Sequence, residues 1–219
     1  MMSNQRNIFL IGLVLVIIVI IAGIFWVKTY STPKKVPEIH GFLLPETKGV
    51  PPFALQKADG SSFTEKNFMG HWNFVFFGYT NCPDICPMTL NVLNQAWQKL
   101  AAEHDKAGKS LTDDLQVVFI SVDPSRDDLA KMQQYVNYFN PAFLGVTGND
   151  KQLALISKYF GIVYEKVANK EDSADNYLVN HGSAIIIINP KGEYQGVFSA
   201  PHEAHNIATD FAKIKAYWE

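Results

Sequence analysis

The chain has 219 residues, with 19 basic and 21 acidic side chains and a formal net charge of -2. It carries no net positive field and no dense Lys/Arg block, so the composition argues against binding to nucleic acid. Its two cysteines are too few for a multi-bridge disulfide framework, a four-thiolate zinc site or an iron–sulfur cluster. Any cysteine chemistry must therefore depend on one pair.

The N-terminal part contains an uncharged apolar run from Ile8 to Val27. As a helix rising about 1.5 Å per residue, this run would be about 30 Å long, which matches the hydrocarbon core of a bilayer. It ends in bulky aromatic residues instead of a small-residue cleavage site, which favours a retained anchor over a signal peptide. We expect a short tail, a transmembrane helix, a tether and a folded domain at residues 1–7, 8–27, 28–44 and 45–219.

The part after the tether alternates predicted strands and helices. A hairpin is expected around the turn dipeptide Asp59-Gly60. Compact apolar runs predict buried strands, and apolar spacing of three and four predicts amphipathic helices. The strands are expected at 73–77, 115–122, 162–167, 183–188 and 194–198, and the helices at 88–100, 127–139, about 150–160 and 202–218. A polar excursion through Glu171 and Asp175 precedes the 183–188 strand. This order predicts an α/β, thioredoxin-like fold, with a mixed sheet flanked by helices.

The two cysteines, Cys82 and Cys86, lie in GYTNCPDICPM between the first long strand and its helix. The end of a strand and the start of a helix favour a thiolate over a thiol. Side chains four apart on a helix have Cβ atoms about 5 to 6 Å apart, which is wide for a disulfide and suits a shared metal ion. Pro87 disfavours helical geometry at Cys86, so a metal site and a redox disulfide both remain open.

Two thiolates are an incomplete set for most metals, and His181 is the candidate third ligand. It directly precedes the buried strand 183–188, whose start lies beside the cysteine loop in a thioredoxin-like sheet. Thioredoxins place a cis-proline there, whereas this chain has Asn180-His181-Gly182, which favours metal binding over dithiol exchange. The other five histidines are expected at the surface: His40, His71, His104, His202 and His205.

Two thiolates and one imidazole form a soft set that suits Cu(I) and leaves Cu(II) accessible. Structural zinc would want a fourth ligand, and catalytic zinc would need a water and a base. Copper is therefore the predicted metal. Asp123, at the end of the second strand, is expected near the same edge, either orienting His181 and balancing charge or acting as a helix cap. Met88 is an auxiliary sulfur candidate or a core residue.

Three stretches resemble the SCO/SenC family: FGYTNCPDICP at 77–87, SVDPSRD at 121–127, and His181 before an apolar strand. The resemblance covers roughly residues 45–218. That family consists of membrane-tethered, thioredoxin-like copper proteins that help to assemble cytochrome c oxidase. Where its members usually carry Asp-His-Ser, this chain has an asparagine and a glycine around the histidine.

By this resemblance, Cys82, Cys86 and His181 match the copper ligands, and Asp123 matches an acidic residue near the site. The implied function is a metallochaperone that delivers copper to subunit II of cytochrome c oxidase, with other periplasmic copper chaperones as further candidate partners.

The resemblance also implies a soluble domain outside the cytoplasm. The basic residues around the apolar run favour the opposite orientation, but we follow the resemblance. No Arg/Ser-rich transit segment precedes the run, which favours a single-pass protein of the bacterial inner membrane with its domain in the periplasm.

Two enzyme alternatives use the same cysteines. One is a thiol-disulfide reductase that keeps the copper-site cysteines of the oxidase reduced, with Cys82 and Cys86 forming a redox disulfide. The other is a peroxiredoxin-like peroxidase. A peroxidase is expected to carry threonine three residues before the attacking cysteine, and this chain has Tyr79 and Pro83 at those positions, which argues against it.

Overall fold

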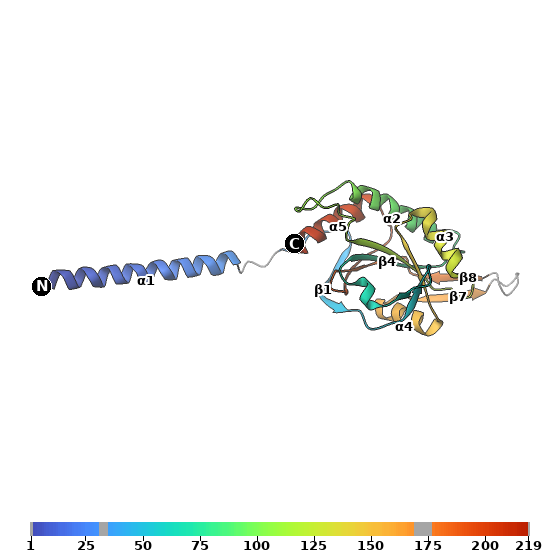
Figure 1. The fold of residues 1–219 in the computed structure, drawn as a ribbon, viewed down its shortest axis with the longest axis horizontal. Coiled ribbons are helices and arrows are strands. Elements are labelled where there is room, and N and C mark those ends of the chain that lie inside the picture. Colours follow the sequence, from blue (N-terminus) through green and yellow to red (C-terminus); the bar gives the residue numbers. More distant parts are fainter. Residues whose placement is uncertain (1, 31–34, 169–176, 219) are drawn as a thin grey trace. The chain divides into compact units, whose positions relative to one another are not determined.

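The computed structural model describes residues 2–30, 35–168 and 177–218. The chain divides into two compact units, Met1–Pro37 and Glu38–Glu219, each described by itself. The first contains helix α1, Met2–Tyr30 (Figure 1). Within the described part of the chain, no helix is both long enough and apolar enough to cross a membrane. The span expected at 8–27 therefore stays a prediction.

The second unit is built around a mixed sheet. Its strands are β1 Phe42–Gly49, β2 Leu55–Lys57, β3 Ser62–Phe63, β4 Trp72–Gly78, β5 Leu115–Ser121, β6 Leu144–Thr147, β9 Ile185–Ile188 and β10 Glu193–Phe198. They form one eight-stranded sheet in the order β1-β10-β9-β4-β5-β6-β2-β3. β4 pairs in parallel with β5 and antiparallel with β9, and β5 pairs in parallel with β6.

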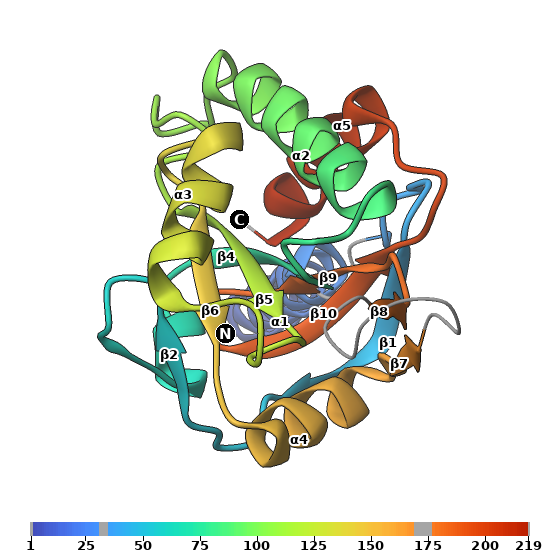
Figure 2. The same ribbon diagram turned by 90° about the vertical axis from the view of Figure 1, so that its right-hand side faces the viewer.

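Helices cover both faces of this sheet (Figure 2). Helices α2 Ile85–Ala101, α3 Leu129–Phe139 and α5 Ala204–Trp218 lie on one face, and α4 Asp150–Phe160 lies on the other. A one-turn 3-10 helix, η1 Glu65–Phe68, follows β3. The central strands are buried on both sides, and every residue of β4 and β9 is buried. The α/β, thioredoxin-like architecture follows from this doubly covered arrangement.

The helix ends follow the capping signals of the sequence. Asn149 caps α4 by accepting a hydrogen bond from the backbone N–H of Gln152, and Gly161 ends that helix in the left-handed conformation. Asp128 caps α3 in the same way, so this helix begins after the expected residue 127. The predicted hairpin around Asp59-Gly60 is formed by β2 and β3.

One local expectation was wrong. Helix α2 begins at Ile85, so Cys86 lies in its first turn in spite of Pro87. The N–H groups of a first turn have no partner within the helix, so a proline at this depth removes no hydrogen bond. The first i to i-4 bond of α2 runs from the Met88 N–H to the Asp84 carbonyl.

A second, separate sheet consists of β7 Tyr164–Ala168 and β8 Tyr177–His181. These two antiparallel strands form a hairpin in which Tyr164 pairs with His181 and Ala168 with Tyr177. The first strand was expected at 162–167, but β8 was not predicted. The polar excursion through Glu171 and Asp175 lies outside the described residues.

Candidate metal centre

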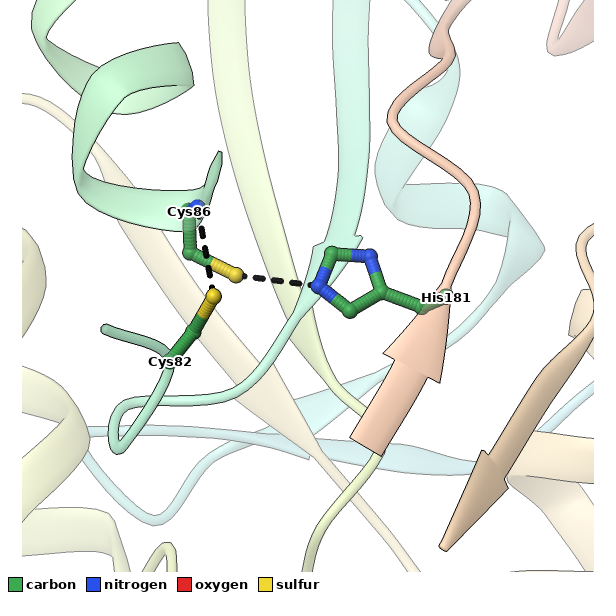
Figure 3. Close-up of side chains that lie close together, drawn as sticks. All are labelled: Cys82, Cys86 and His181. Carbon is green, nitrogen blue, oxygen red and sulfur yellow. Dashed lines mark hydrogen bonds between the residues drawn. The ribbon is translucent and has the colours of Figure 1, made fainter. Parts of the chain in front are cut away.

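The two cysteines and His181 meet at one end of the sheet (Figure 3). Cys82 lies in the loop after β4, Cys86 in the first turn of α2, and His181 at the end of β8. The two sulfurs and a ring nitrogen all lie within 4.8 Å of one another. The donors of a three-coordinate metal with bonds of about 2.0 to 2.3 Å lie roughly 3.5 to 4 Å apart. The three side chains therefore fit a single ion.

The sulfurs differ in exposure and in charge. Cys86 is fully buried, whereas Cys82 is half-buried. The hydrogen bond from the Cys86 side chain holds the pKa of Cys82 well below its usual value, in spite of the opposing effect of burial. The same interaction, reinforced by burial, raises the pKa of Cys86. The pair therefore favours a thiolate at Cys82 and a thiol at Cys86.

Backbone groups complete the cysteine site. The Cys86 N–H donates to the Cys82 sulfur at 3.4 Å, which places the thiolate at the N-terminus of α2. Gly78, the last residue of β4, allows the Cys86 sulfur to approach the strand. A Cβ atom at this glycine would lie 2.7 Å from that sulfur and 2.8 Å from the Phe119 ring.

The imidazole of His181 is oriented for ligation. Its Nδ1 lies 3.0 Å from the Gly182 carbonyl oxygen, which can only accept, so Nδ1 donates this hydrogen bond. The other nitrogen, Nε2, faces the cysteines and lies 3.1 Å from the Cys86 sulfur (Figure 3). The rings of Phe76 and Tyr79 lie edge-on to the imidazole, with centroids 6.0 and 5.9 Å away.

The sequence profile of the SCO1/SenC family matches residues 44–218. The chain belongs to the SCO1/SenC family. A curated relative, the mitochondrial SCO1 homolog 1 of Arabidopsis thaliana, is 35% identical over 167 residues, which cover 76% of this chain and 47% of that protein. The chain thus spans about half the length of this relative.

Two solved structures of the family are similar to this one. Arabidopsis thaliana ScoI with copper bound has 32% identity and a TM-score of 0.67, covering 76% of this chain and 98% of that one. Yeast Sco1 with copper bound has 29% identity and a TM-score of 0.67, covering 78% and 90%. Both relatives hold the metal that the donor set favours here.

In this member of the SCO1/SenC family, Asp123 lies near the site but bonds to other partners than His181. Its carboxylate is fully buried and accepts hydrogen bonds from the Arg126 Nε and the Tyr177 hydroxyl, both at 2.5 Å. The helix-cap alternative does not hold either, since α3 is capped by Asp128.

The remaining candidates occupy other environments. Met88 is exposed, as are His40, His104 and His205, while His71 is half-buried. His202 was expected at the surface, but it is half-buried, and its Nε2 lies 2.6 Å from the Ser183 carbonyl oxygen. Burial lowers its pKa. Among the described residues, Cys82, Cys86 and His181 form the one cluster of three metal-ligating side chains.

Sequence reasoning missed Asp127, which holds the cysteine loop. Its buried carboxylate accepts hydrogen bonds from the Thr80 N–H at 2.8 Å, the Thr80 hydroxyl at 2.5 Å and the Ser121 hydroxyl at 2.6 Å. Thr80 lies two residues before Cys82, so this carboxylate ties the loop to the end of β5. The available signal was the second acidic residue of SVDPSRD, four residues after Asp123.

Proposed function

We propose that this protein is a copper metallochaperone that delivers copper to subunit II of cytochrome c oxidase during its assembly. The observation that supports this most directly is the convergence of two cysteine sulfurs and the His181 Nε2 within 4.8 Å. Copper is the cargo of this site. Thiolates are the ligands that Cu(I) prefers, and the imidazole makes the same site acceptable to Cu(II).

The protonation pattern suits loading from a donor protein. Cys82 can bind an incoming Cu(I) as a thiolate, and the His181 Nε2 already faces the sulfur pair. Cys86 then loses its proton as its sulfur joins the ion. Delivery reverses these steps, with thiolates of the acceptor replacing the donor atoms one at a time. Other periplasmic copper chaperones are the proposed source of the ion.

We propose that residues 8–27 anchor the chain once in the bacterial inner membrane, with the copper domain in the periplasm. The uncharged run of apolar residues supports an anchor. The oxidase also lies in the membrane, so an anchor would keep the copper domain near its partner. Two partners held in one bilayer meet at a high effective concentration, so transfer does not need a tight interface. Fusion of a reporter that is active only in the periplasm to the C-terminus tests the orientation, and an inactive reporter would exclude it.

The alternative function is a thiol-disulfide reductase acting on the copper-site cysteines of the oxidase. The lowered pKa of Cys82 supports it, because a thiolate is the attacking species in exchange. The Cys82 sulfur would form a mixed disulfide with one sulfur of the substrate and release the other as a thiolate. Attack by the Cys86 sulfur would then free the reduced substrate and leave the Cys82–Cys86 disulfide, so that two electrons pass to the substrate.

Three variants of the full-length chain separate the two functions: His181→Ala, Cys82→Ser, and His104→Ala as an exposed histidine control. A chaperone requires near-stoichiometric copper in the reduced wild type, a marked loss of Cu(II) binding in His181→Ala and no loss in His104→Ala. A reductase requires disulfide reduction that survives His181→Ala, fails in Cys82→Ser and needs no copper. A wild-type protein that binds no copper under reducing conditions would exclude the chaperone.

A further inference from the structure

Four side chains that meet at the first residue of β8 form a cluster that we call the hairpin clamp: Asp123, Arg126, Lys166 and Tyr177. Asp123 is completely buried after the end of β5. One of its oxygens accepts from the Arg126 Nε and the other from the Tyr177 hydroxyl, both at 2.5 Å. The Lys166 Nζ lies 3.6 Å from the second oxygen. A buried carboxylate with three donors around it is a strong fixed point, because a lost partner would leave a buried oxygen with fewer hydrogen bonds or a weaker ion pair.

Arg126 also contacts Tyr177 directly. One terminal nitrogen of the guanidinium donates to the Tyr177 backbone carbonyl at 2.9 Å. The guanidinium carbon also lies 3.6 Å from the centroid of the Tyr177 ring, in a cation–π arrangement. Tyr177 is therefore held through its hydroxyl, its ring and its backbone.

These contacts matter because the β7–β8 hairpin forms a separate sheet and is not joined to the eight-stranded sheet by strand pairing. Alternate residues of a strand share a face, so Tyr177, Val179 and His181 lie on the same side of β8. Tyr177 and His181 are the first and last residues of this strand, about 13 Å apart at a rise of about 3.3 Å per residue. The clamp thus holds one end of the strand, and the metal-facing imidazole stands at the other.

We propose that the hairpin clamp is a positioning device that sets the place of His181 relative to the two sulfurs, with Tyr177 as its principal positioning residue. The proposal rests on the proposed copper function. Cys82 and Cys86 belong to the β4–α2 segment, whereas the Tyr177 hydroxyl bonds to Asp123, so loss of this hydroxyl displaces the imidazole and leaves the sulfur pair in place. The clamp thereby governs whether bound copper has a third ligand.

Tyr177→Phe in the full-length chain tests the proposal, because it deletes the hydroxyl bond to Asp123 and keeps the aromatic ring. The matched control is Tyr159→Phe, which removes a hydroxyl that donates to the Lys48 and Gly49 carbonyls at 3.0 and 2.9 Å, both outside the hairpin. Arg126→Lys is a second variant, since lysine keeps the charge and loses the planar fork and the stacking.

We expect Tyr177→Phe and Arg126→Lys to weaken Cu(II) binding by about tenfold or more, as outer partners of metal ligands commonly do. Cu(I) binding should change by less than about threefold, because two thiolates satisfy Cu(I) without the imidazole. The nitrogen hyperfine splitting from the imidazole should also become smaller in the Cu(II) electron paramagnetic resonance spectrum. Tyr159→Phe should resemble the wild type in all three measurements.

A measurement without copper keeps the proposal separate from the proposed function. In the metal-free protein, hydrogen exchange at the β8 amides should be faster in Tyr177→Phe than in Tyr159→Phe, with exchange in β4 and β5 unchanged. If the wild type bound no copper, the proposed function would fail. The exchange comparison would still show whether the Tyr177 hydroxyl stabilises the hairpin. The proposal is overturned if β8 exchange is the same in both variants, if Cu(II) binding is unaffected, or if Cu(I) and Cu(II) affinities fall equally.

Discussion

Replacing Gly78 by alanine should disturb the metal centre through a single methyl group. The added Cβ would lie 2.7 Å from the Cys86 sulfur and 2.8 Å from the Phe119 ring, whereas ordinary contacts begin at about 3.4 Å. Relief requires a displacement of roughly 0.7 Å, more than the tolerance of about 0.5 Å within which a functional site must be held. The site has nowhere to expand, because Cys86 and Phe119 are both completely buried.

Overpacking of this kind costs about 1 to 3 kcal/mol. For a domain of this size, that loss lowers the melting temperature by roughly 2 to 12 °C. We also expect Cu(I) affinity to fall by about tenfold, because the sulfur shift changes the geometry of the ligand set. Thermal unfolding followed by circular dichroism and competition with a chromophoric Cu(I) chelator measure the two effects.

Gly49→Ala is the matched control, since a Cβ atom there would meet nothing within 4 Å. It should leave both the melting temperature and the copper affinity close to the wild-type values. If Gly78→Ala also behaved like the wild type, the Cys86 sulfur would not be held against the end of β4, and the description of the site would be incorrect.

Three further predictions concern protonation, the cysteine loop and the sequence around His181. Because the pKa of Cys82 is lowered and that of Cys86 is raised, Cu(I) loading should release about one proton. The apparent Cu(I) affinity should then rise about tenfold per pH unit between pH 7 and 8. Titration calorimetry in buffers of different ionisation enthalpy measures the number of protons released, and release of two protons would contradict the prediction. Asp127→Asn should lower the free energy of unfolding by about 1.5 to 3 kcal/mol in urea denaturation, because a buried acceptor of three hydrogen bonds loses its charge; an unchanged midpoint would count against the anchoring role. Asn180→Asp should alter copper affinity by less than about threefold, since residue 180 is exposed on the face of β8 opposite His181. A tenfold gain in affinity in the same chelator competition would contradict this prediction and show that the introduced carboxylate acts on the ligands.

The buried strands were predictable because hydrophobic burial acts on short, continuous runs. Residues 73–77 and 183–188 are almost wholly apolar, and both contribute central strands. No strand was predicted for β1, and its first three residues were assigned to the tether, because FLLPETKG is a short segment interrupted by proline that is only partly buried. It lies at the edge of the sheet, where one partner strand suffices and the hydrophobic signal is weak.

That the three candidate ligands lie together was predictable for a different reason. Cys82 and Cys86 are four positions apart in the sequence, and His181 was identified from its place before a buried strand. The contacts behind the ligands were less accessible to sequence reasoning. Tyr177 stands next to a polar stretch and gives no strand signal, and its bond to Asp123 joins residues 54 positions apart. Long-range polar pairs of this kind leave no periodicity in the sequence.

The unequal exposure of the two sulfurs affects the order in which the ligands would release a copper ion. Cys86 is shut in by α2 and β4, whereas Cys82 and His181 are both within reach of solvent. An approaching acceptor can therefore touch the ion only from the side where those two residues stand. Cys86 is the most deeply buried ligand. The bond between the ion and the Cys86 sulfur should therefore be the last to break during transfer, because an acceptor cannot reach that sulfur directly.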